Sequence, residues 1–369
     1  MKIQPESATK TANIIIDFFS NIDRIDDYFR LRKIERVKNL PAPIPGFGLE
    51  DDMFQNYDMH PEDMDIEVAQ IDNQTFNAML EKVASFSPDQ APGKELKLVV
   101  KEKNTNTLLG FIKLGSPIIN SKPRNNYLGD VPELTIFNQR AIMGFVIVPV
   151  QPFGFNYLGG KLMALICTSH KVREMLNDKY ETEFCLFETT SLYGNIKGMS
   201  MYDGLKPFLR FKGDTESKFV PTLGEEAYAS CKKIIEDDVQ GEIIHKDASS
   251  RKLKITTKMI SLIKSSLKET DMELHDKFVS AIKKAESVTT QKRFYMSDYG
   301  YENTRDVLLG KTEILIKGPN YHKHDLENII SWWKRKASSR YNKLKSEDRI
   351  REELEVWNAD TMNKIDIIR

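Results

Sequence analysis

One apolar strand that runs directly into a glycine-bearing turn and an apolar helix constrains the fold of this chain most. Residues 144–166 read GFVIVPVQPFGFNYLGGKLMALI. A strand with almost no polar residue is covered on both faces, so it belongs in the middle of a sheet between layers of helices. The first amides of the following helix lack internal partners and favour an anion, and glycine lets a phosphate come close to them. The segment therefore predicts a layered α/β domain with a candidate anion-binding turn, against the alternative of a glycine turn that holds no ligand.

Length and composition place the chain among soluble globular proteins of more than one domain. It has 369 residues, of which 40% are hydrophobic and 29% charged, and its 54 basic residues balance its 54 acidic ones. This length predicts two or three domains, and zero net charge gives no overall attraction to nucleic acid or membranes. Residues 46–75 nevertheless hold nine acids and no Lys or Arg, whereas residues 291–345 hold twelve basic residues and six acids. We expect the acidic stretch to form a solvated loop or a cover over a basic cleft.

Cysteine usage and hydropathy indicate a reducing compartment and no membrane span. The three cysteines are widely spaced and form neither a disulfide framework nor a zinc pattern; they are Cys167, Cys185 and Cys231. No apolar run approaches the roughly 20 residues that a membrane span needs, and the N-terminal residues lack a secretory segment. We therefore expect a cytoplasmic protein without a membrane partner.

Apolar periodicity predicts a β-rich centre, residues 95–215, in which strands and helices alternate as in a mixed α/β layer domain. Its expected elements are, in order, a hairpin over 95–103 and 108–116, a central strand over 140–150, a helix over 160–180, a strand over 183–191, a short helix over 198–205 and a last strand over 208–213.

The flanking regions are predicted to be mainly helical. Residues 1–94 are expected to hold a helix over 11–38 with a break near Asn21, a Pro- and Gly-rich terminator over 39–48, the acidic stretch and a helix over 73–86. Residues 216–369 are expected to be mainly helical, with one strand candidate over 312–318. The predicted fold class is α/β (α+β): a mixed central sheet with flanking helices, an N-terminal helical segment and a mainly helical C-terminal region.

The order of these elements is similar to that of the GNAT acyltransferase fold. In that family the turn pattern Q/R-x-x-G-x-G/A binds the pyrophosphate of acyl-coenzyme A. Gln151, Gly154 and Asn156 occupy its positions here, with Asn156 in place of the last small residue. The resemblance implies acetyl-coenzyme A, or another acyl-coenzyme A, as cofactor. The residues expected to bind it are Val148, Val150, Gln151, Gly154, Asn156, Gly159 and Gly160.

A narrower resemblance, over residues 108–213, is to the Mom-like family of phage DNA-modification proteins. The DruA-like domain of bacterial defence and mobile elements looks related to that family. The segments that carry the resemblance are LLGFIKLGSP, PRNNYLGD, NQRAIMGFVIVPV, FNYLGGKLM, YETEFCLFETT and GMSMYDGLKPFLRFKG. Mom-like phage proteins are GNAT-like and add a carbamoylmethyl-type group to adenine in DNA. The resemblance implies an acyltransferase that modifies DNA bases and so protects phage DNA from restriction, in the host cell's cytoplasm if the chain is phage-encoded.

Three residues are candidates for proton transfer in such a reaction. Glu188 ends a predicted strand where the family has an acid facing the cofactor, and burial could move its pKa toward neutral so that it removes a proton from an amine. Tyr202, with its neighbour Ser200, lies where GNAT enzymes often carry a tyrosine that protonates the leaving thiolate. The alternatives are a solvated acid at a strand end and a tyrosine at the edge of the core.

Three polar residues near the hairpin and the central strand are candidates for binding DNA or cofactor phosphate. Arg124, with Asn125, follows the hairpin, and its guanidinium suits a bidentate phosphate contact. A plain polar turn is the alternative there. Arg140 precedes the central strand, where a salt bridge at the sheet end explains it equally well.

The segment SWWKRKASSRYNKLK, residues 331–345, combines aromatic and basic side chains. Rings that stack on bases and cations that neutralise phosphates are the usual make-up of a nucleic-acid surface. The alternative is a helix that buries its tryptophans and leaves its charges in water. The candidate DNA contacts are Trp332, Trp333, Lys334, Arg335, Lys336 and Arg340. His322 and His324 have no third ligand nearby, so we predict no metal site.

Two other functions stay open at this stage. One is a GNAT-fold N-acetyltransferase that acts on a small molecule or a protein. The other is a non-catalytic DNA-binding or defence-related protein, which Asn156 in the cofactor turn favours. DNA is the expected partner, and a homodimer is an open alternative for the assembly.

Overall fold

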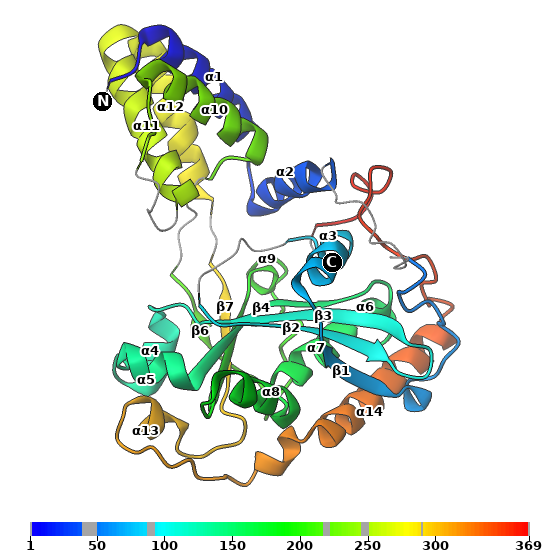
Figure 1. Cartoon of the computed structure of the whole chain (residues 1–369). Coiled ribbons are helices and arrows are strands. Elements are labelled where there is room, and N and C mark those ends of the chain that lie inside the picture. Colours follow the sequence, from blue (N-terminus) through cyan, green and yellow to red (C-terminus); the bar gives the residue numbers. More distant parts are fainter. Residues whose placement is uncertain are drawn as a thin grey trace. The chain divides into compact units, whose positions relative to one another are not determined.

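A seven-stranded mixed sheet forms the centre of the larger of two units in this computed structural model (Figure 1). The structure describes residues 2–38, 50–86, 93–216, 222–244, 251–288 and 291–367. We call the unit of residues 1–39, 217–290 and 367–369 the helical unit, and that of residues 40–216 and 291–366 the sheet unit.

The sheet runs in the order β1-β2-β3-β4-β5-β7-β6, with β4 in its middle. Its strands are β1 Ile66–Gln70, β2 Glu95–Glu102, β3 Thr107–Gly115, β4 Ala141–Pro149, β5 Leu186–Ser191, β6 Arg210–Asp214 and β7 Arg293–Ser297. Neighbouring strands are antiparallel except for β4 and β5, which are parallel. The predicted hairpin and central strand are confirmed, as is the mixed α/β class with flanking helices.

The parallel strands β4 and β5 pair only at their first residues and stop pairing toward their carboxyl ends. Pairing between β4 and β5 covers residues 141–144 and 186–189. Beyond Gly144, β4 continues beside β3 as far as Pro149, while the end of β5 pairs with β7. The turn predicted to bind an anion follows β4 at this open end.

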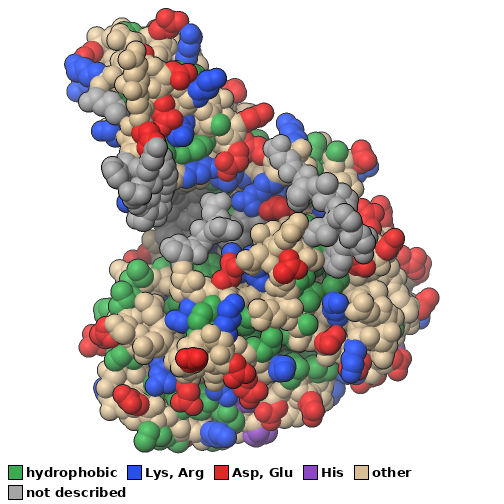
Figure 2. Space-filling view, viewed as in Figure 1, with side chains coloured by type: hydrophobic (Ala, Val, Ile, Leu, Met, Phe, Trp, Pro, Cys, Tyr) green, Lys and Arg blue, Asp and Glu red, His purple; other side chains and the backbone are tan. Residues whose placement is uncertain are grey.

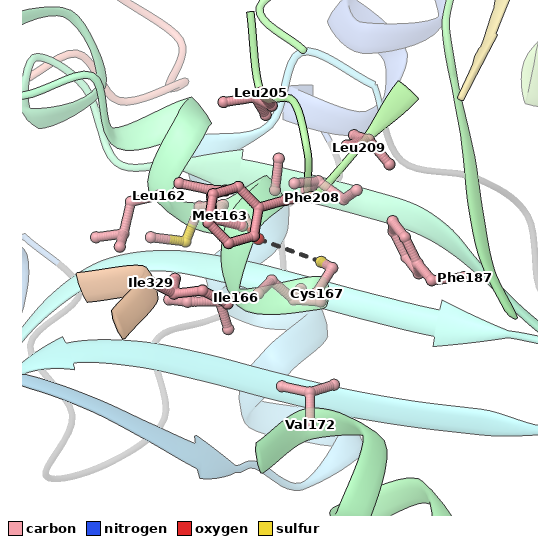
Figure 3. Close-up of a cluster of buried hydrophobic side chains, with 14 of the residues drawn as sticks. Leu162, Met163, Ile166, Cys167, Val172, Phe187, Leu205, Phe208, Leu209 and Ile329 are labelled. Atoms are coloured by element: carbon pink, nitrogen blue, oxygen red, sulfur yellow. Dashed lines mark hydrogen bonds between the residues drawn. The ribbon is translucent and has the colours of Figure 1, made fainter. Parts of the chain in front are cut away.

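Helices cover the sheet because their apolar faces have no other surface to bury. They are η1 Pro61–Asp63, α3 Asn73–Val83, α4 Lys122–Leu128, α5 Leu134–Arg140, α6 Phe153–Asn156, α7 Gly159–Cys167, α8 His170–Tyr180, α9 Tyr193–Ile196, α13 Thr304–Leu308, η2 Tyr321–His324 and α14 Leu326–Ser346. Helix α7 is apolar and buried except for Lys161, as expected for a helix inside a core. Figure 3 shows its side chains packed against Leu205, Phe208, Leu209, Phe187 and Ile329, with the Cys167 thiol bonded to the Met163 carbonyl oxygen.

The helical unit packs the N-terminal helix against helices from far along the chain. Its helices are α1 Pro5–Ser20, α2 Ile25–Lys38, α10 Glu225–Val239, α11 Arg251–Thr270 and α12 Met272–Ser287. Helix α1 contacts α10, α11 and α12. Its buried residues Ala8, Ala12, Ile15 and Phe19 recur at three- and four-residue spacing, so they form one stripe facing these partners. The predicted break near Asn21 is confirmed, because α1 ends at Ser20 and α2 begins at Ile25.

Several predicted elements differ from the structure. Residues 160–180 form two helices, because the Ser169 side chain accepts a hydrogen bond from the Val172 amide and starts α8. Residues 198–205 form turns rather than a helix. Residues 312–318 form no strand and make one isolated bridge, between Lys317 and Tyr301; strand β7 at 293–297 was missed. The Pro- and Gly-rich residues 39–48 lie outside the described residues.

The acidic stretch is more ordered than a solvated loop. Residues 66–70 within it form edge strand β1, whose burial alternates along the strand as expected for one half-covered face. Phe54, Tyr57 and Met64 are buried in the core of the sheet unit. The acidic side chains of this stretch therefore belong to a segment that packs against the core of the sheet unit.

The two units divide the chain differently from the predicted segments 1–94, 95–215 and 216–369. The C-terminal region does not stay together: residues 217–290 join residues 1–39, whereas residues 291–366 return to the sheet unit and supply β7 and α14. Strand β7 fits between β5 and β6, so the sheet needs this later segment to be complete.

Candidate functional site

The turn after β4 is a compact helical turn whose amides are largely used within the protein. The Gln151 side-chain oxygen accepts a hydrogen bond from the Phe155 amide at 3.0 Å. The Gly154 amide donates to the Val150 carbonyl oxygen at 2.8 Å, and the Asn156 amide donates to that of Pro152 at 2.9 Å. Val150 is itself buried. These amides do not point outward as the sequence predicted.

Protein side chains pack closely against the glycines of the turn. A Cβ atom on Gly154 would lie 2.5 Å from the Gln151 side-chain nitrogen. One on Gly159 would lie 2.6 Å from the Phe153 ring, and one on Gly160 would lie 2.6 Å from the Met201 sulfur. Side chains of the protein therefore lie close to the backbone that these glycines would otherwise leave open to a diphosphate. Val148, half-buried on β4, lies before the turn.

Asn156 connects the turn to the segment after α14 through hydrogen bonds to the backbone of Arg351. Its side chain is buried, donates from Nδ2 to the Arg351 carbonyl oxygen at 2.7 Å, and accepts from the Arg351 amide at 3.1 Å. An amide side chain is suited to satisfying both groups of one peptide segment. This reciprocal pair gives a physical reason for Asn where the family pattern has a small residue.

Helix α14, the predicted basic helix, packs directly on the turn. The Trp333 indole is fully buried and donates from Nε1 to the Tyr157 carbonyl oxygen at 2.9 Å. Trp332 is half-buried and its ring contacts Phe208 edge-on. Burial of Trp333 contradicts its predicted role in stacking on bases, because a helix against an apolar core turns its largest rings inward.

The basic residues of α14 have divided roles. Lys334 donates to the Glu62 carbonyl oxygen at 2.8 Å, so it ties the acidic stretch to the helix. Arg335 and Lys336 are exposed, and the Lys336 ammonium lies 5.9 Å from the Trp332 ring centroid. Arg340 reaches back to the turn, where its Nε donates to the Phe155 carbonyl oxygen at 3.4 Å.

An arginine cluster surrounds Phe155 at the turn. The half-exposed Phe155 ring lies 4.6 Å from the Arg340 guanidinium and 3.7 Å from that of Arg351, measured to the ring centroid. Partial burial lowers the pKa of Arg340, and the nearby charges of Arg349 and Arg351 lower it further. The sequence analysis missed Phe155, Arg349 and Arg351, because the turn and the segment after α14 meet only in the fold.

Glu188 forms a fully buried ion pair with Arg124. Arg124 Nη1 lies 3.1 Å from Glu188 Oε1, both side chains are 0% exposed, and the guanidinium lies 4.0 Å from the Phe137 ring centroid. Burial raises the pKa of Glu188 to about 7, although the charge of Arg124 opposes that rise. Arg124 is therefore neither a surface phosphate ligand nor part of a plain polar turn, because it lies in helix α4 with its side chain fully buried.

The same guanidinium fixes an apolar loop at the surface. Arg124 donates to the carbonyl oxygens of Ile118 at 2.8 Å and Ile119 at 2.6 Å, and both of these side chains are exposed. Figure 2 shows hydrophobic side chains on the part of the surface where α4 and α5 lie. Asn125 is half-buried, and its side chain contacts Asn120.

The structure does not bring Glu188 and Tyr202 together. The buried Tyr202 hydroxyl bonds to Thr189, which follows Glu188 on β5. Successive residues of a strand point to opposite faces, so Glu188 and Tyr202 lie on opposite faces of the sheet. Burial raises the pKa of Tyr202, which keeps its proton bound.

A polar cluster around Asp203 lies beside Tyr202. The Asp203 carboxylate accepts from the Tyr295 hydroxyl at 2.8 Å, from Arg293 Nη1 at 2.8 Å and from the Ser200 amide at 3.1 Å. The Lys161 ammonium donates to the Asp203 carbonyl oxygen at 3.0 Å, which ties this segment to α7. Ser200 is buried in this cluster, and the contact of Lys161 with Asp203 joins the cluster to the first turn of α7.

The remaining predicted features have ordinary structural partners. Arg140 contacts Glu183, through the carbonyl oxygen at 3.2 Å and the carboxylate at 3.6 Å, as the salt-bridge alternative predicts. His324 is buried and bonds to the Thr168 carbonyl oxygen at 2.7 Å. Across the described residues, no group of three or more His, Cys, Asp or Glu side chains could hold a metal ion. None of the helices in the described ranges is long and apolar enough to cross a membrane.

Comparison with known proteins gives one family. Residues 47–200 match the family described as Druantia protein DruA. The match ends before β6, so it covers less than half of the chain, and it supports a relationship to a phage-defence-related family. Neither the curated proteins nor the solved structures contain a significant match to this chain.

Proposed function

We propose that this chain is a defence-related protein whose sheet unit binds DNA through the arginine cluster around Phe155. The family match over residues 47–200 supports the defence-related part, and it includes the turn that carries Phe155. The single observation that carries DNA binding is the meeting of Arg340 and Arg351 at that ring, with Arg349 close enough to Arg340 to lower its pKa. Guanidinium groups suit phosphate oxygens, and like charges held close together gain from a polyanion that neutralises them.

The geometry of the cluster favours binding to an extended anion. The ring and the Phe155 carbonyl oxygen hold the Arg340 guanidinium in position, so less side-chain freedom is lost on binding. Arg349 and Arg351 are exposed, with single carboxylate partners in Glu347 at 2.6 Å and Glu355 at 3.4 Å. Such exposed ion pairs are weak and leave both arginines able to exchange a carboxylate for a phosphate.

Removing the cluster should weaken DNA binding and its salt dependence. With Arg340, Arg349 and Arg351 all changed to Gln, we expect the affinity for a 20-base-pair duplex to fall by about 30-fold or more at low salt. The slope of log affinity against log salt concentration should become shallower by about 0.9 for each lost phosphate contact. Fluorescence anisotropy over a series of salt concentrations measures both.

A matched control uses exposed lysines of the helical unit. Lys258, Lys268 and Lys283 are exposed, so changing all three to Gln removes the same charge far along the chain from the turn. This control should retain the affinity of the unaltered protein. An equal loss in both triple variants would show that total charge alone governs binding and would remove the proposed site.

Acyl transfer to a DNA base from an acyl-coenzyme A is a second proposal for the sheet unit. The observation that favours it is the open parallel pair β4–β5, because ligands of α/β sheets bind at the carboxyl ends of strands. Tyr202 and Ser200 lie at that end, whereas Glu188 could act only on a group approaching from the α4 face. The close packing of Gly159 and Gly160 weighs against the coenzyme, and DNA binding does not depend on it.

Nucleoside analysis separates the two proposals. If acyl transfer occurs, DNA from cells that express the protein should contain an adenine nucleoside of increased mass, and Tyr202→Phe should abolish it while leaving DNA affinity unchanged. Mass spectrometry of digested DNA measures this. Absence of any modified nucleoside, with cluster-dependent DNA binding intact, would reject acyl transfer to DNA and leave the binding function in place. Turnover on a small amine without DNA affinity would instead support the acetyltransferase alternative.

A further inference from the structure

A small, shallow surface pocket lies near the start of β5, where Leu186 pairs with Ala141, the first residue of β4. Its floor is apolar and its rim is charged. It is lined by Tyr127, Leu186, Pro207, Arg210, Lys212, Met296, Ser297 and Asp298. Neither the predicted site residues nor the arginine cluster contribute to it, so it is a separate feature of the sheet unit.

The charges of the pocket are unbalanced. Two cations, Arg210 and Lys212, line it together with one carboxylate, Asp298. Arg210 Nη1 lies 3.7 Å from Asp298 Oδ2. Among the described residues, none gives the Lys212 ammonium a hydrogen-bond acceptor or an ion-pair partner. That ammonium lies 3.5 Å from the centroid of the Tyr127 ring. One positive charge in the pocket therefore lacks an anion.

A β-bulge places Lys212 at the rim. Strand β6 is the edge of the sheet, and its register against β7 shifts between Phe211 and Gly213, so that Lys212 is the extra residue. Gly213 has a φ of +130°, a conformation that favours glycine. Bulges at sheet edges commonly redirect a side chain toward a functional site. The fold thus keeps an irregular backbone at the residue whose charge has no partner.

Desolvation makes the unpaired charge costly. Lys212 is half-buried, and its pKa is lowered first by burial and then by the charge of Arg210, although Asp298 opposes the effect. A bound anion would offset both causes, because it supplies the missing opposite charge. The position of Lys212 beside Arg210 therefore suits an anionic ligand.

We propose that this pocket binds the phosphate group of a phosphate monoester, held between Lys212 and Arg210. The several oxygens of a phosphate group can accept from both cations at once, and its charge supplies the anion that Lys212 lacks beside the Arg210–Asp298 pair. The guanidinium of Arg210 presents a fork that matches phosphate oxygens, and Lys212 adds a compact point charge. The apolar floor of Leu186, Pro207 and Met296 suits the carbon skeleton attached to the phosphate. The ligand class is a nucleoside monophosphate or the 5′-phosphate at the end of a DNA strand.

Binding measurements with three probes test the site. Isothermal titration calorimetry with inorganic phosphate, adenosine monophosphate and a 5′-phosphorylated oligonucleotide should show binding by at least one of them. Lys212→Met should weaken that binding about tenfold or more, and Lys212→Arg should retain most of it. Binding of the monophosphate alone identifies a free nucleotide as the source, and preference for the phosphorylated over the unphosphorylated oligonucleotide identifies a strand end. The absence of binding by all three probes would overturn the proposal.

A second lysine provides a matched control. The Lys317 ammonium also lies over a tyrosine ring, 4.6 Å from the Tyr321 centroid, but it is exposed and does not line the pocket. Lys317→Met should leave phosphate binding unchanged, and equal losses in the two methionine variants would also overturn the site. Thermal melting of each variant checks that the fold is retained. The proposal is independent of the DNA-binding function, because the arginine cluster variant should keep its phosphate affinity.

Discussion

Changing Arg124 to Met is expected to lower the free energy of unfolding by about 3–5 kcal/mol at pH 8.5, because it leaves the Glu188 carboxylate buried without its counter-ion. Both side chains are 0% exposed, so water cannot replace the lost partner. The change also removes the donors to the carbonyl oxygens of Ile118 and Ile119, which adds the cost of unsatisfied backbone groups. Urea denaturation followed by circular dichroism measures the loss.

The size of this loss should depend on pH in a defined direction. The folded pKa of Glu188, about 7, lies above its ordinary value of 4.5. Its contribution to stability is therefore complete below pH 4.5 and is lost as the pH rises through 7. Without Arg124 the folded pKa should rise further, so the variant should keep losing stability above pH 7, where the unaltered protein levels off. The difference between the two proteins should be larger at pH 8.5 than at pH 6.

Arg140→Met serves as the control for Arg124→Met. Arg140 also pairs with a glutamate, Glu183, but this partner is largely exposed and lies at the end of the sheet. Its removal should cost less than about 1 kcal/mol, without the dependence on pH. A similar small loss for Arg124→Met would mean that the Glu188 carboxylate finds water or another donor, and the buried ion pair would then not stabilise the fold.

Changing Trp333 to Ala is expected to lower the free energy of unfolding by about 3–5 kcal/mol, through the cavity left between α14 and the turn. Trp333→Phe should cost much less, mainly the hydrogen bond to the Tyr157 carbonyl oxygen, worth about 1 kcal/mol. Denaturant titration gives both values, and DNA affinity at a temperature where each variant is folded gives a second readout. The phenylalanine variant should bind DNA as the unaltered protein does.

The opposite pattern would restore the predicted role of this tryptophan. If Trp333→Ala kept the stability of the unaltered protein and lost DNA affinity, the indole would be a surface group that contacts bases. Exposed Arg335 supplies the comparison, since Arg335→Gln should leave stability unchanged. The two residues are two positions apart on α14, so they separate burial from charge on one helix.

Local sequence pattern was sufficient for the elements that bury a regular apolar face. The hairpin of β2 and β3, the central strand β4 and the break between α1 and α2 all follow from periodicity and turn residues. Strand β7 was missed because RFYMS lies among helices and its partners, β5 and β6, precede it in the sequence by long intervals. Pairing of that kind is decided by tertiary context rather than by a local signal.

The candidate site was harder to predict because its residues meet only through the fold. Sequence reasoning picked out Glu188 and Arg124 separately, and the structure joins them as an ion pair. It also picked out Asn156, whose partner, the backbone of Arg351, no pattern could have identified. Adjacent residues of a strand point apart, which is why Glu188 and Tyr202 could not be assigned to one site without knowing the faces of β5.

The chain leaves the sheet after β6 and returns as the neighbouring strand β7. Asp214 pairs with Arg293, and the Thr215 amide donates to the Lys292 carbonyl oxygen at 2.8 Å, so departure and return are adjacent. Topologically, the segment that carries α10, α11 and α12 is an enlarged hairpin loop, and these helices build their hydrophobic interior together with α1. The pairing of β6 with β7 therefore determines where this inserted segment begins and ends, but it sets no limit on the length of the segment.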